Sequence, residues 1–397
     1  MLLENVDYPD RLIEALKDGK LVVFAGAGVS MGDPTNLPDF NSLAEQIAYG
    51  TGEQKKKSEP CEVFLGKLTE KGIAVHNEAA KILSTACVEH NVLHETIINL
   101  FPRRDSIKIV TTNFDQMFEK ALKSQKIATS IFNAPALPLG DDIQGIIHVH
   151  GNVENPKKMI ITDEDFGKAY LSEGYASRFL VKLFETYTIL FVGYSYNDTI
   201  LRYLSRAMLK NNVGNRFILT DHPRRNWSML GITPVQFSKD DYEQLQRSLV
   251  KLGDIAKRGL TDWQARILEI GNRPTREMID DTEIEYYLSD FNRSRVLAKG
   301  VHGKYWLQIL DERKVFDNCF TEEIVFSERD ELWCNWLEKE FLGKDDKTLF
   351  DFIFSHKSVL NRKTAENFAR AICSSEGIEG ETLVNEYSGL RVPAVRC

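Results

Sequence analysis

The sequence of 397 residues has few cysteines and no paired ones. Its six cysteines are scattered, and none belongs to a C-x-x-C pair. Disulfide frameworks and zinc ribbons both depend on regularly spaced cysteines, so the sequence signals neither. The pattern instead fits reduced thiols in the cytoplasm.

Long apolar runs and a targeting segment are also lacking. No stretch approaches the ~18 consecutive apolar residues of a membrane-spanning helix. The first residues, MLLENVD, have neither the basic patch nor the apolar core of a secretory signal. We therefore expect a cytoplasmic protein that makes no membrane contact.

The sequence has no excess of positive charge. Lys and Arg number 50 against 58 Asp and Glu, which gives a formal net charge of -8. This balance argues against an electrostatic grip on nucleic acid along the whole chain. The short basic runs at 55–57, 103–104 and 224–225 are of the kind that usually faces solvent. Direct nucleic-acid binding is therefore not expected.

What the sequence does contain is a series of short apolar runs that predict strands. They are residues 21–25, 107–111, 145–149, 188–192 and 216–220. Helix-patterned stretches, such as 114–122 and 198–209, separate them, and this alternation indicates βα units. We predict an α/β fold with a Rossmann-like, mostly parallel sheet, in which ligands bind at the carboxyl ends of the strands.

Two stretches are too long or too helical for simple crossovers between these strands. Residues about 40–105 and about 160–187 have helical periodicity and little β signal, and we interpret them as helical insertions. After residue 240 the strand pattern stops. We expect one domain over residues 1–240 and a separate C-terminal domain over 241–397, with a role in assembly or sensing.

Two glycines follow the first predicted strand. Gly26 and Gly28 flank Ala27, and Ser30 comes next, so the backbone can approach a ligand closely and its N–H groups can hold phosphate. A tight strand-to-helix turn that needs glycine only for packing is the alternative. The glycines alone do not decide between the two.

Polar residues follow two further strands. Asn113 and Asp115 come after the second strand, where they can bind a ligand or cap a helix. His150 ends the run that contains His148, and an imidazole there can act as a general base. We expect His148, inside the apolar run, to be a structural histidine. Metal binding by the two histidines is not expected, because no cysteine or carboxylate completes the set.

The last two strands also end in polar residues. Gly193 and Ser195 follow the fourth strand, and Thr220 and Asp221 end the fifth. In a dinucleotide-binding fold, a carboxylate such as that of Asp221 commonly binds a ribose diol. All of these residues stand in turns after strands, where one crevice can gather them.

This ordered set of motifs resembles the sirtuin family. The motifs are Gly-Ala-Gly-x-Ser at 26–30, Pro-Asp-Phe at 38–40, Thr-x-Asn-x-Asp at 111–115, His-Gly at 150–151 and Gly-x-Ser at 193–195. By this resemblance Asn113 and His150 act at the nicotinamide ribose. It assigns NAD contacts to Gly26, Ala27, Gly28, Ser30, Asp39, Phe40, Asp115, Gly193 and Ser195.

The sequence departs from the sirtuin deacylases in several places. Residues 151–192 contain no cysteine, so the zinc module with its two C-x-x-C pairs is missing, and we expect neither zinc nor any other metal. Asn41 stands where the family usually has Arg, and Thr112 stands where it usually has Gln. These departures put acyl-peptide binding in doubt.

The variant is similar instead to the zinc-less sirtuin-like domains of bacterial antiphage defence. That resemblance implies hydrolysis of NAD, as substrate, to ADP-ribose and nicotinamide, which depletes NAD in the infected cell. It also implies a HerA-type hexameric ATPase or another activator as partner. We expect a homo-oligomer because the residues after 240 are rich in aromatic side chains of the kind enriched in interface cores. The alternatives are a module that senses NAD or ADP-ribose without turnover, and an NAD-dependent deacylase or ADP-ribosyltransferase.

Overall fold

The computed structural model describes residues 1–84, 89–195, 214–222, 226–271, 278–288 and 335. Contacts divide the chain into two compact units. One spans Leu2–Lys257, and the other comprises Met1 and Arg258–Cys397. The sheet and the candidate site lie in the first unit.

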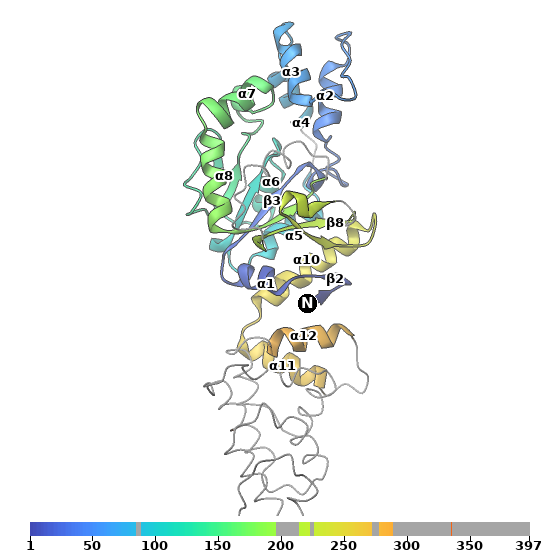
Figure 1. The fold of residues 1–397 in the computed structure, drawn as a ribbon, viewed down its shortest axis with the longest axis vertical. Coiled ribbons are helices and arrows are strands. Elements are labelled where there is room, and N and C mark those ends of the chain that lie inside the picture. The colour runs from blue at the N-terminus through green and yellow to red at the C-terminus, as the bar shows by residue number, and fades with distance from the viewer. Residues whose placement is uncertain (85–88, 196–213, 223–225, 272–277, 289–334, 336–397) are drawn as a thin grey trace, which may run out of the picture. The chain divides into compact units, whose positions relative to one another are not determined.

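A seven-stranded sheet forms the centre of the first unit (Figure 1). Its strands are β3 (Leu21–Ala25), β4 (Lys108–Thr111), β5 (Ile131–Asn133), β6 (Gly145–His148), β7 (Thr188–Val192), β8 (Arg216–Thr220) and β9 (Thr233–Gln236). They lie in the order β5-β6-β4-β3-β7-β8-β9, and every pairing is parallel. The predicted α/β fold with a parallel sheet is confirmed.

The sequence did not predict β5 and β9, the two strands at the edges of this sheet. β5 has three residues, and its Ile131 is exposed. β9 contains Pro234, which lacks the N–H group of a central strand and is tolerated at a sheet edge. Both strands therefore lack the continuous apolar run that marks the five predicted ones.

Helices cover both faces of the sheet. α8 (Tyr175–Thr186) packs Phe179, Leu183 and Phe184 into the core cluster that contains Phe24 and Phe191 of the central strands. On the other side lie α1 (Asp10–Lys17), α5 (Val92–Leu100), α6 (Met117–Ser124) and α10 (Tyr242–Lys257), which pack against one another (Figure 1). The sheet is therefore buried on both faces, as its continuous apolar strands require.

A small helical group forms a second core in this unit. It consists of α2 (Phe40–Ala48), α3 (Cys61–Glu70) and α4 (Val75–Leu83), with Phe64 and Leu65 at its centre. The segment that follows β6 closes this core with Met159 and Ile161. Only part of the expected insertion over 40–105 belongs to this group, because α5 packs with α6 and α10 beside the sheet.

The second expected insertion, 160–187, is helical throughout most of its length. It contains α7 (Asp163–Gly167), a π-helical turn η4 (Lys168–Ser172) and α8. α7 contacts α3, and η4 contacts α7 and α8. The remaining short elements are β1 (Leu2–Leu3), β2 (Val6–Asp7), η1 (Ala27–Val29), η2 (Arg104–Ser106), η3 (Pro156–Lys158) and η6 (Trp227–Leu230).

α10 belongs to the first compact unit, although it follows residue 240. It packs on α1 and α5, and the Ser248 hydroxyl lies 2.8 Å from the Tyr8 hydroxyl. The unit therefore extends beyond the expected boundary through the whole of α10. In the second unit, α11 (Leu260–Gly271) buries Trp263 against Tyr286 of α12 (Met278–Leu288). Most of 241–397, and the helix expected over 198–209, lie outside the described residues.

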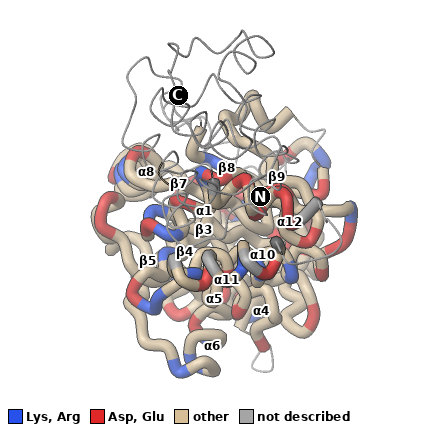
Figure 2. Tube along the Cα trace, turned by 90° about the horizontal axis from the view of Figure 1, so that it is seen from below, with Lys and Arg blue, Asp and Glu red and all other residues tan. Residues whose placement is uncertain are grey.

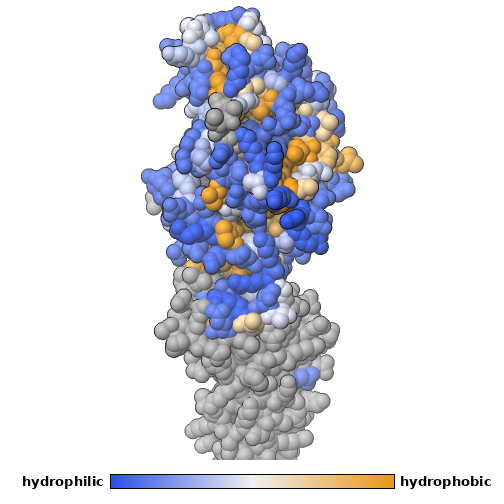
Figure 3. Space-filling view, turned by 180° about the vertical axis from the view of Figure 1, so that it is seen from behind, coloured by the Kyte–Doolittle hydropathy of each residue, from blue (hydrophilic) through white to orange (hydrophobic). Residues whose placement is uncertain are grey.

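The surface of the described residues is mixed in charge and polarity. Basic and acidic residues alternate around the chain in Figure 2. On the side shown in Figure 3, hydrophobic areas are separated by hydrophilic ones. None of the described helices is long and apolar enough to cross a membrane. Exclusion of direct nucleic-acid binding stays a prediction.

The turns after β3 and β7 touch through their glycines. The N–H group of Gly28 donates to the carbonyl oxygen of Gly193 at 2.9 Å. A Cβ atom added at Gly28 would lie 2.8 Å from the same oxygen and 2.9 Å from the Cα of Gly193. Gly193 itself has a φ of +76°, which favours glycine. Glycine is therefore required on both sides of this contact.

We predict that Gly28→Ala lowers the free energy of unfolding by about 1–3 kcal/mol, because the added methyl group overpacks a backbone contact. For a unit of this size each kcal/mol corresponds to a fall in Tm of roughly 2–4 °C. Gly32→Ala is the matched control, since its Cβ would meet only Asn91 Nδ2 at 3.6 Å. Equal melting temperatures for the two variants, measured by calorimetry, would contradict the prediction.

Candidate functional site

The candidate site lies at the carboxyl edge of the sheet, where the chain changes direction. From β3 the chain builds β4, β5 and β6 on one side, and it then crosses over to β7 on the other side. In open α/β sheets, ligands bind at such a switch point. Residues after β3, β4, β6 and β7 meet at this edge.

Ser30 is the centre of a buried hydrogen-bond network at this edge. Its hydroxyl donates to Asp115 Oδ2 at 2.9 Å. Ser30 Oγ also lies 3.1 Å from His94 Nε2 and 3.3 Å from Asn113 Nδ2. Ser30 is 2% exposed, so water does not compete for these bonds. The network ties the turn after β3 to the loop after β4 and to α5.

The backbone fixes the proton positions in this network. The N–H group of Asn91 donates to His94 Nδ1 at 3.2 Å, so the neutral ring carries its proton on Nε2 and donates it to Ser30. Burial lowers the pKa of His94 to about 3, which keeps the ring neutral. The Ser30 oxygen therefore accepts from His94 and Asn113 and donates to Asp115, which uses its full capacity.

Asn113 is held by both hydrogens of its amide group. Nδ2 donates to the Gly26 carbonyl at 3.1 Å and to Ser30 Oγ. Because a carbonyl can only accept, the orientation of the amide is settled, and Oδ1 is the end that the network does not use. The Asn113 backbone is fixed too, since its N–H group donates to Thr111 Oγ1 at 3.0 Å. The side chain thus presents one acceptor in a fixed direction.

Both carboxylate oxygens of Asp115 accept hydrogen bonds. Oδ1 accepts from the N–H group of Met117 at 3.1 Å, and Oδ2 accepts from Ser30. Burial raises the pKa of Asp115, and these two bonds partly oppose that effect. Asp115 also supports the start of α6, which begins at Met117. The ligand-binding and helix-capping interpretations of this motif are therefore compatible.

His148 is the structural histidine that the sequence predicts. Its Nδ1 donates to the Asn113 carbonyl oxygen at 3.1 Å, and its Nε2 lies 2.7 Å from Glu119 Oε1. Burial alone would lower the pKa of His148, but the hydrogen bond and negative charge of Glu119 outweigh it and raise the pKa. Its position fixes the backbone of the loop that carries Asn113.

His150 is enclosed by aromatic side chains. It is 0% exposed, its Nε2 lies 2.8 Å from the Tyr170 hydroxyl, and the rings of Phe166 and Phe114 lie beside it. Its Nδ1 has no hydrogen-bond partner among the described residues. Burial lowers the pKa of His150 to about 3. In this conformation His150 is a neutral imidazole shielded from solvent.

The turn after β3 uses most of its own N–H groups. Those of Gly26, Gly28, Val29 and Ser30 donate to carbonyl oxygens within the protein. Ala27, the first residue of η1, lies between the two glycines. Phosphate binding by the N–H groups of Gly26 and Gly28 therefore stays a prediction that needs this turn to rearrange. The glycines here serve the close contact with the turn after β7.

The other predicted site residues make local contacts. Asp39 caps α2, because its Oδ1 accepts from the N–H group of Ser42 at 2.7 Å, and Phe40 is the first residue of that helix. Ser195 is exposed after β7. Asp221 Oδ2 accepts from the N–H group of Asp240 at 3.3 Å. None of these four residues has a direct bond to the Ser30 network in the described part of the chain, and their NAD contacts stay predictions.

Sequence reasoning missed Asn91 and His94. Asn91 Oδ1 caps α5 by accepting from the N–H groups of Leu93 and His94, and its Nδ2 donates to the Val29 carbonyl at 2.8 Å. A signal was present, since Asn followed three residues later by a polar side chain at the start of a helical pattern indicates a capped helix. The sequence could not show that this helix start faces the glycine turn.

The described residues contain no group of three or more His, Cys, Asp or Glu placed to hold a metal ion. Cys61 is buried, its thiol donates to Asn41 Oδ1 at 2.9 Å, and burial raises the pKa of this thiol to about 11. The other cysteines lie outside the described residues. The absence of zinc therefore stays a prediction.

Residues 107–247 match the SIR2-like domain family. Protein y4cA of Sinorhizobium fredii, which is uncharacterised, is 26% identical over 400 residues, covering 88% of this chain and 32% of that protein. Defense-associated sirtuin 2 of Bacillus subtilis is 22% identical over 237 residues, covering 56% of this chain and 23% of that protein. NAD(+) hydrolase ThsA of Acinetobacter baumannii is 24% identical over 200 residues, covering 49% of this chain and 40% of that protein.

These comparisons concern part of the chain and part of each relative. The chain spans less than half the length of each of these three relatives. It has a Sir2-like domain with distant homology to a defence-associated sirtuin and to the NAD(+) hydrolase ThsA. A Sir2-like domain implies NAD binding. The matched range includes Asn113, Asp115 and His150 and begins after Ser30.

We predict that Ser30 and Asp115 are coupled through the direction of one proton. Asp115→Asn keeps the side-chain volume but points an NH₂ group at an oxygen that already accepts two hydrogens, so the free energy of unfolding falls by about 1–3 kcal/mol. In Ser30→Ala that conflict disappears. The double variant therefore loses less unfolding free energy than the two single variants lose together, by about 0.5–3 kcal/mol.

Denaturant unfolding of the four proteins measures this coupling. Asp141→Asn, at an exposed carboxylate 3.7 Å from Lys182 Nζ, is the control for loss of a negative charge. If the losses of unfolding free energy in Ser30→Ala and Asp115→Asn simply add in the double variant, the Ser30 hydroxyl does not donate its hydrogen to Asp115.

Proposed function

We propose that this chain, through its Sir2-like domain, hydrolyses NAD to ADP-ribose and nicotinamide. The observation that carries the proposal is the amide of Asn113, whose two hydrogens are bound by Gly26 and Ser30 and whose Oδ1 is left as a fixed acceptor. It stands at the switch point of the sheet, where a dinucleotide binds in folds of this kind. The distant homology to the NAD(+) hydrolase ThsA supports the same reaction.

NAD hydrolysis depends more on positioning the ribose and the attacking water than on protonating the leaving group. The bond between C1′ of the ribose and the pyridinium nitrogen breaks, its electron pair stays on nicotinamide, and nicotinamide leaves as a neutral molecule. A water oxygen then bonds to C1′ and releases a proton. In this proposal Asn113 Oδ1 accepts a hydrogen bond from that water or from a ribose hydroxyl and so fixes its direction.

His150 is the general base in this proposal. A neutral imidazole can take the proton that water or a ribose hydroxyl releases, and such a base typically contributes ~100 to 10,000-fold to the rate. The lowered pKa of the ring belongs to the enclosed conformation, in which the imidazole is unprotonated. To reach a substrate, the ring has to be opened to the site, because it is fully buried here.

We further propose that this activity serves defence against phage through NAD depletion. The distant homology to Defense-associated sirtuin 2 supports this role. A homo-oligomer and an activating partner, such as a HerA-type hexameric ATPase, are part of the same proposal. The rival functions are NAD sensing without turnover, and deacylation or ADP-ribosyl transfer.

We predict that Asn113→Ala and His150→Ala each lower the rate of NAD cleavage at least about a hundredfold. Asn113→Ala removes the fixed acceptor, and His150→Ala removes the base. The full chain is mixed with NAD, and nicotinamide and ADP-ribose are quantified by chromatography. Binding of ADP-ribose, measured by calorimetry, stays within a few-fold of wild type, because neither side chain is expected to hold the diphosphate.

Asn77→Ala, on the exposed face of α4, is the control for an asparagine lost away from the site. NAD that is bound but never cleaved by the wild-type chain would favour the sensing module. Transfer of ADP-ribose or of an acyl group in place of hydrolysis would favour the second rival. Near wild-type cleavage by either site variant would refute the assigned roles.

A further inference from the structure

Neither nitrogen of His150 can meet a substrate in the conformation described. Nε2 is 2.8 Å from the Tyr170 hydroxyl, and the unpartnered Nδ1 is enclosed as well. A general base must come within hydrogen-bond reach of the proton that it takes. His150, the base proposed for NAD hydrolysis, is therefore inaccessible to a substrate, and Tyr170 is the side chain that blocks its Nε2.

The bond between Tyr170 and His150 has a preferred direction. If Tyr170 donates to Nε2, one polar hydrogen, on Nδ1, is left without a partner among the described residues. If Nε2 donates instead, both the Tyr170 hydrogen and the Nδ1 lone pair are left. The first arrangement leaves fewer buried groups unsatisfied, so Tyr170 is the donor. Its hydroxyl thereby occupies the nitrogen with which a substrate hydroxyl would have to bond.

Tyr170 and Phe166 come from one short segment, residues 163–172, which comprises α7 and η4. Their rings stack with centroids 5.7 Å apart, and both stand edge-on to the His150 ring, at 5.9 Å and 5.2 Å. η4 is a π-helical turn, a conformation that is frequent at functional sites. Tyr170 is partly buried, and its neighbour Leu171 is 83% exposed, so one turn of helix separates solvent from the candidate base.

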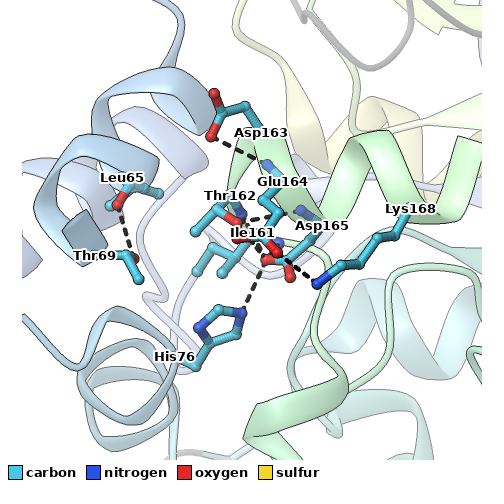
Figure 4. A network of polar contacts seen from close by, with 9 residues as sticks. All are labelled: Leu65, Thr69, His76, Ile161, Thr162, Asp163, Glu164, Asp165 and Lys168. Atoms are coloured by element: carbon cyan, nitrogen blue, oxygen red, sulfur yellow. Dashed lines mark hydrogen bonds and ion pairs between the residues drawn. The ribbon is translucent and has the colours of Figure 1, made fainter. Parts of the chain in front are cut away.

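The segment is tied down at a point away from His150. Asp165 Oδ2 accepts from the N–H and hydroxyl groups of Thr162, at 2.9 Å and 2.8 Å, and lies 2.9 Å from His76 Nε2 of α4 (Figure 4). At the other end, the Ser177 hydroxyl donates to the Tyr170 carbonyl at 2.6 Å. Gly174, with a φ of +61°, separates η4 from α8 and gives the chain a point at which to turn.

We propose that residues 163–172 form a gate over His150, with the Tyr170 hydroxyl as the contact that holds the gate closed. This inference rests on the proposed NAD hydrolysis, since it concerns access to the base of that reaction. Opening moves Tyr170 away from Nε2 and lets a ribose hydroxyl or water take its place. His76 acts as a latch, because its bond to Asp165 anchors the same segment to α4.

Two variants at separate places test the gate. Tyr170→Phe keeps the ring but leaves Nε2 of His150 without its partner, which disfavours the closed form. His76→Ala removes the latch and leaves the Thr162 cap of α7 intact. Tyr175→Phe is the matched control, because Tyr175 begins α8 outside the segment and loses the same hydroxyl.

The first measurement is access to His150, and it requires no NAD. The full chain is treated with diethyl pyrocarbonate, and modification of each histidine is followed by mass spectrometry. We expect His150 to react about tenfold faster in Tyr170→Phe, equivalent to about 1.4 kcal/mol, and several-fold faster in His76→Ala. His148, equally buried but bonded to Glu119, stays protected in every variant and reports that the fold is intact.

The second measurement is kcat/KM for NAD cleavage, which rises in parallel with the labelling rate if the gate limits access. Faster labelling with no cleavage by any variant would leave the gate standing and refute NAD hydrolysis by this chain without a partner. Unchanged labelling in both variants overturns the gate. A fall in kcat for Tyr170→Phe with unchanged labelling also overturns it, because Tyr170 would then position His150 during the reaction.

Discussion

The hydroxyl of Ser30 joins three segments that lie far apart in the sequence. It donates to Asp115 after β4, and it accepts from His94 of α5 and from Asn113. A serine oxygen has one hydrogen and two lone pairs, so each partner has a defined place and no bond is left for water. Since the group is buried, losing any partner leaves a polar atom unsatisfied in a medium of low polarity. The direction of the Asn113 amide, and with it the proposed chemistry, depends on this one oxygen.

The central strands could be predicted because each is a continuous apolar run that is buried on both faces. β3, at Leu21–Ala25, coincides with its prediction, and Ile189 and Phe191 show the same pattern in β7. The edge strands could not be predicted, because a strand covered by few neighbours needs no apolar run, and Pro234 even argues against one. The packing of α5 beside the sheet could not be predicted either, because helical periodicity marks an apolar face but does not show which elements cover it.

The candidate site could be predicted as a set of residue types and positions. Glycines, Asn113 and His150 all follow strands, and the topology of a parallel sheet brings such residues to one edge. The hydrogen-bond directions could not be predicted, because they depend on backbone groups such as the Gly26 carbonyl and the Asn91 N–H. Nor did any motif mark Tyr170, whose importance comes from its three-dimensional position against His150.

The contact between the turns after β3 and β7 has a consequence for how this fold diverges. A Cβ atom at Gly28 would meet the backbone of Gly193, and one at Gly193 would meet Val29 and the Gly26 carbonyl oxygen of the opposite turn. A side chain at either position displaces the opposite turn, so neither turn can change its backbone path alone. The two glycines are therefore expected to be retained together wherever the two turns keep this contact. Joint retention of glycine at these positions would record that dependence across lineages, although 164 residues lie between them.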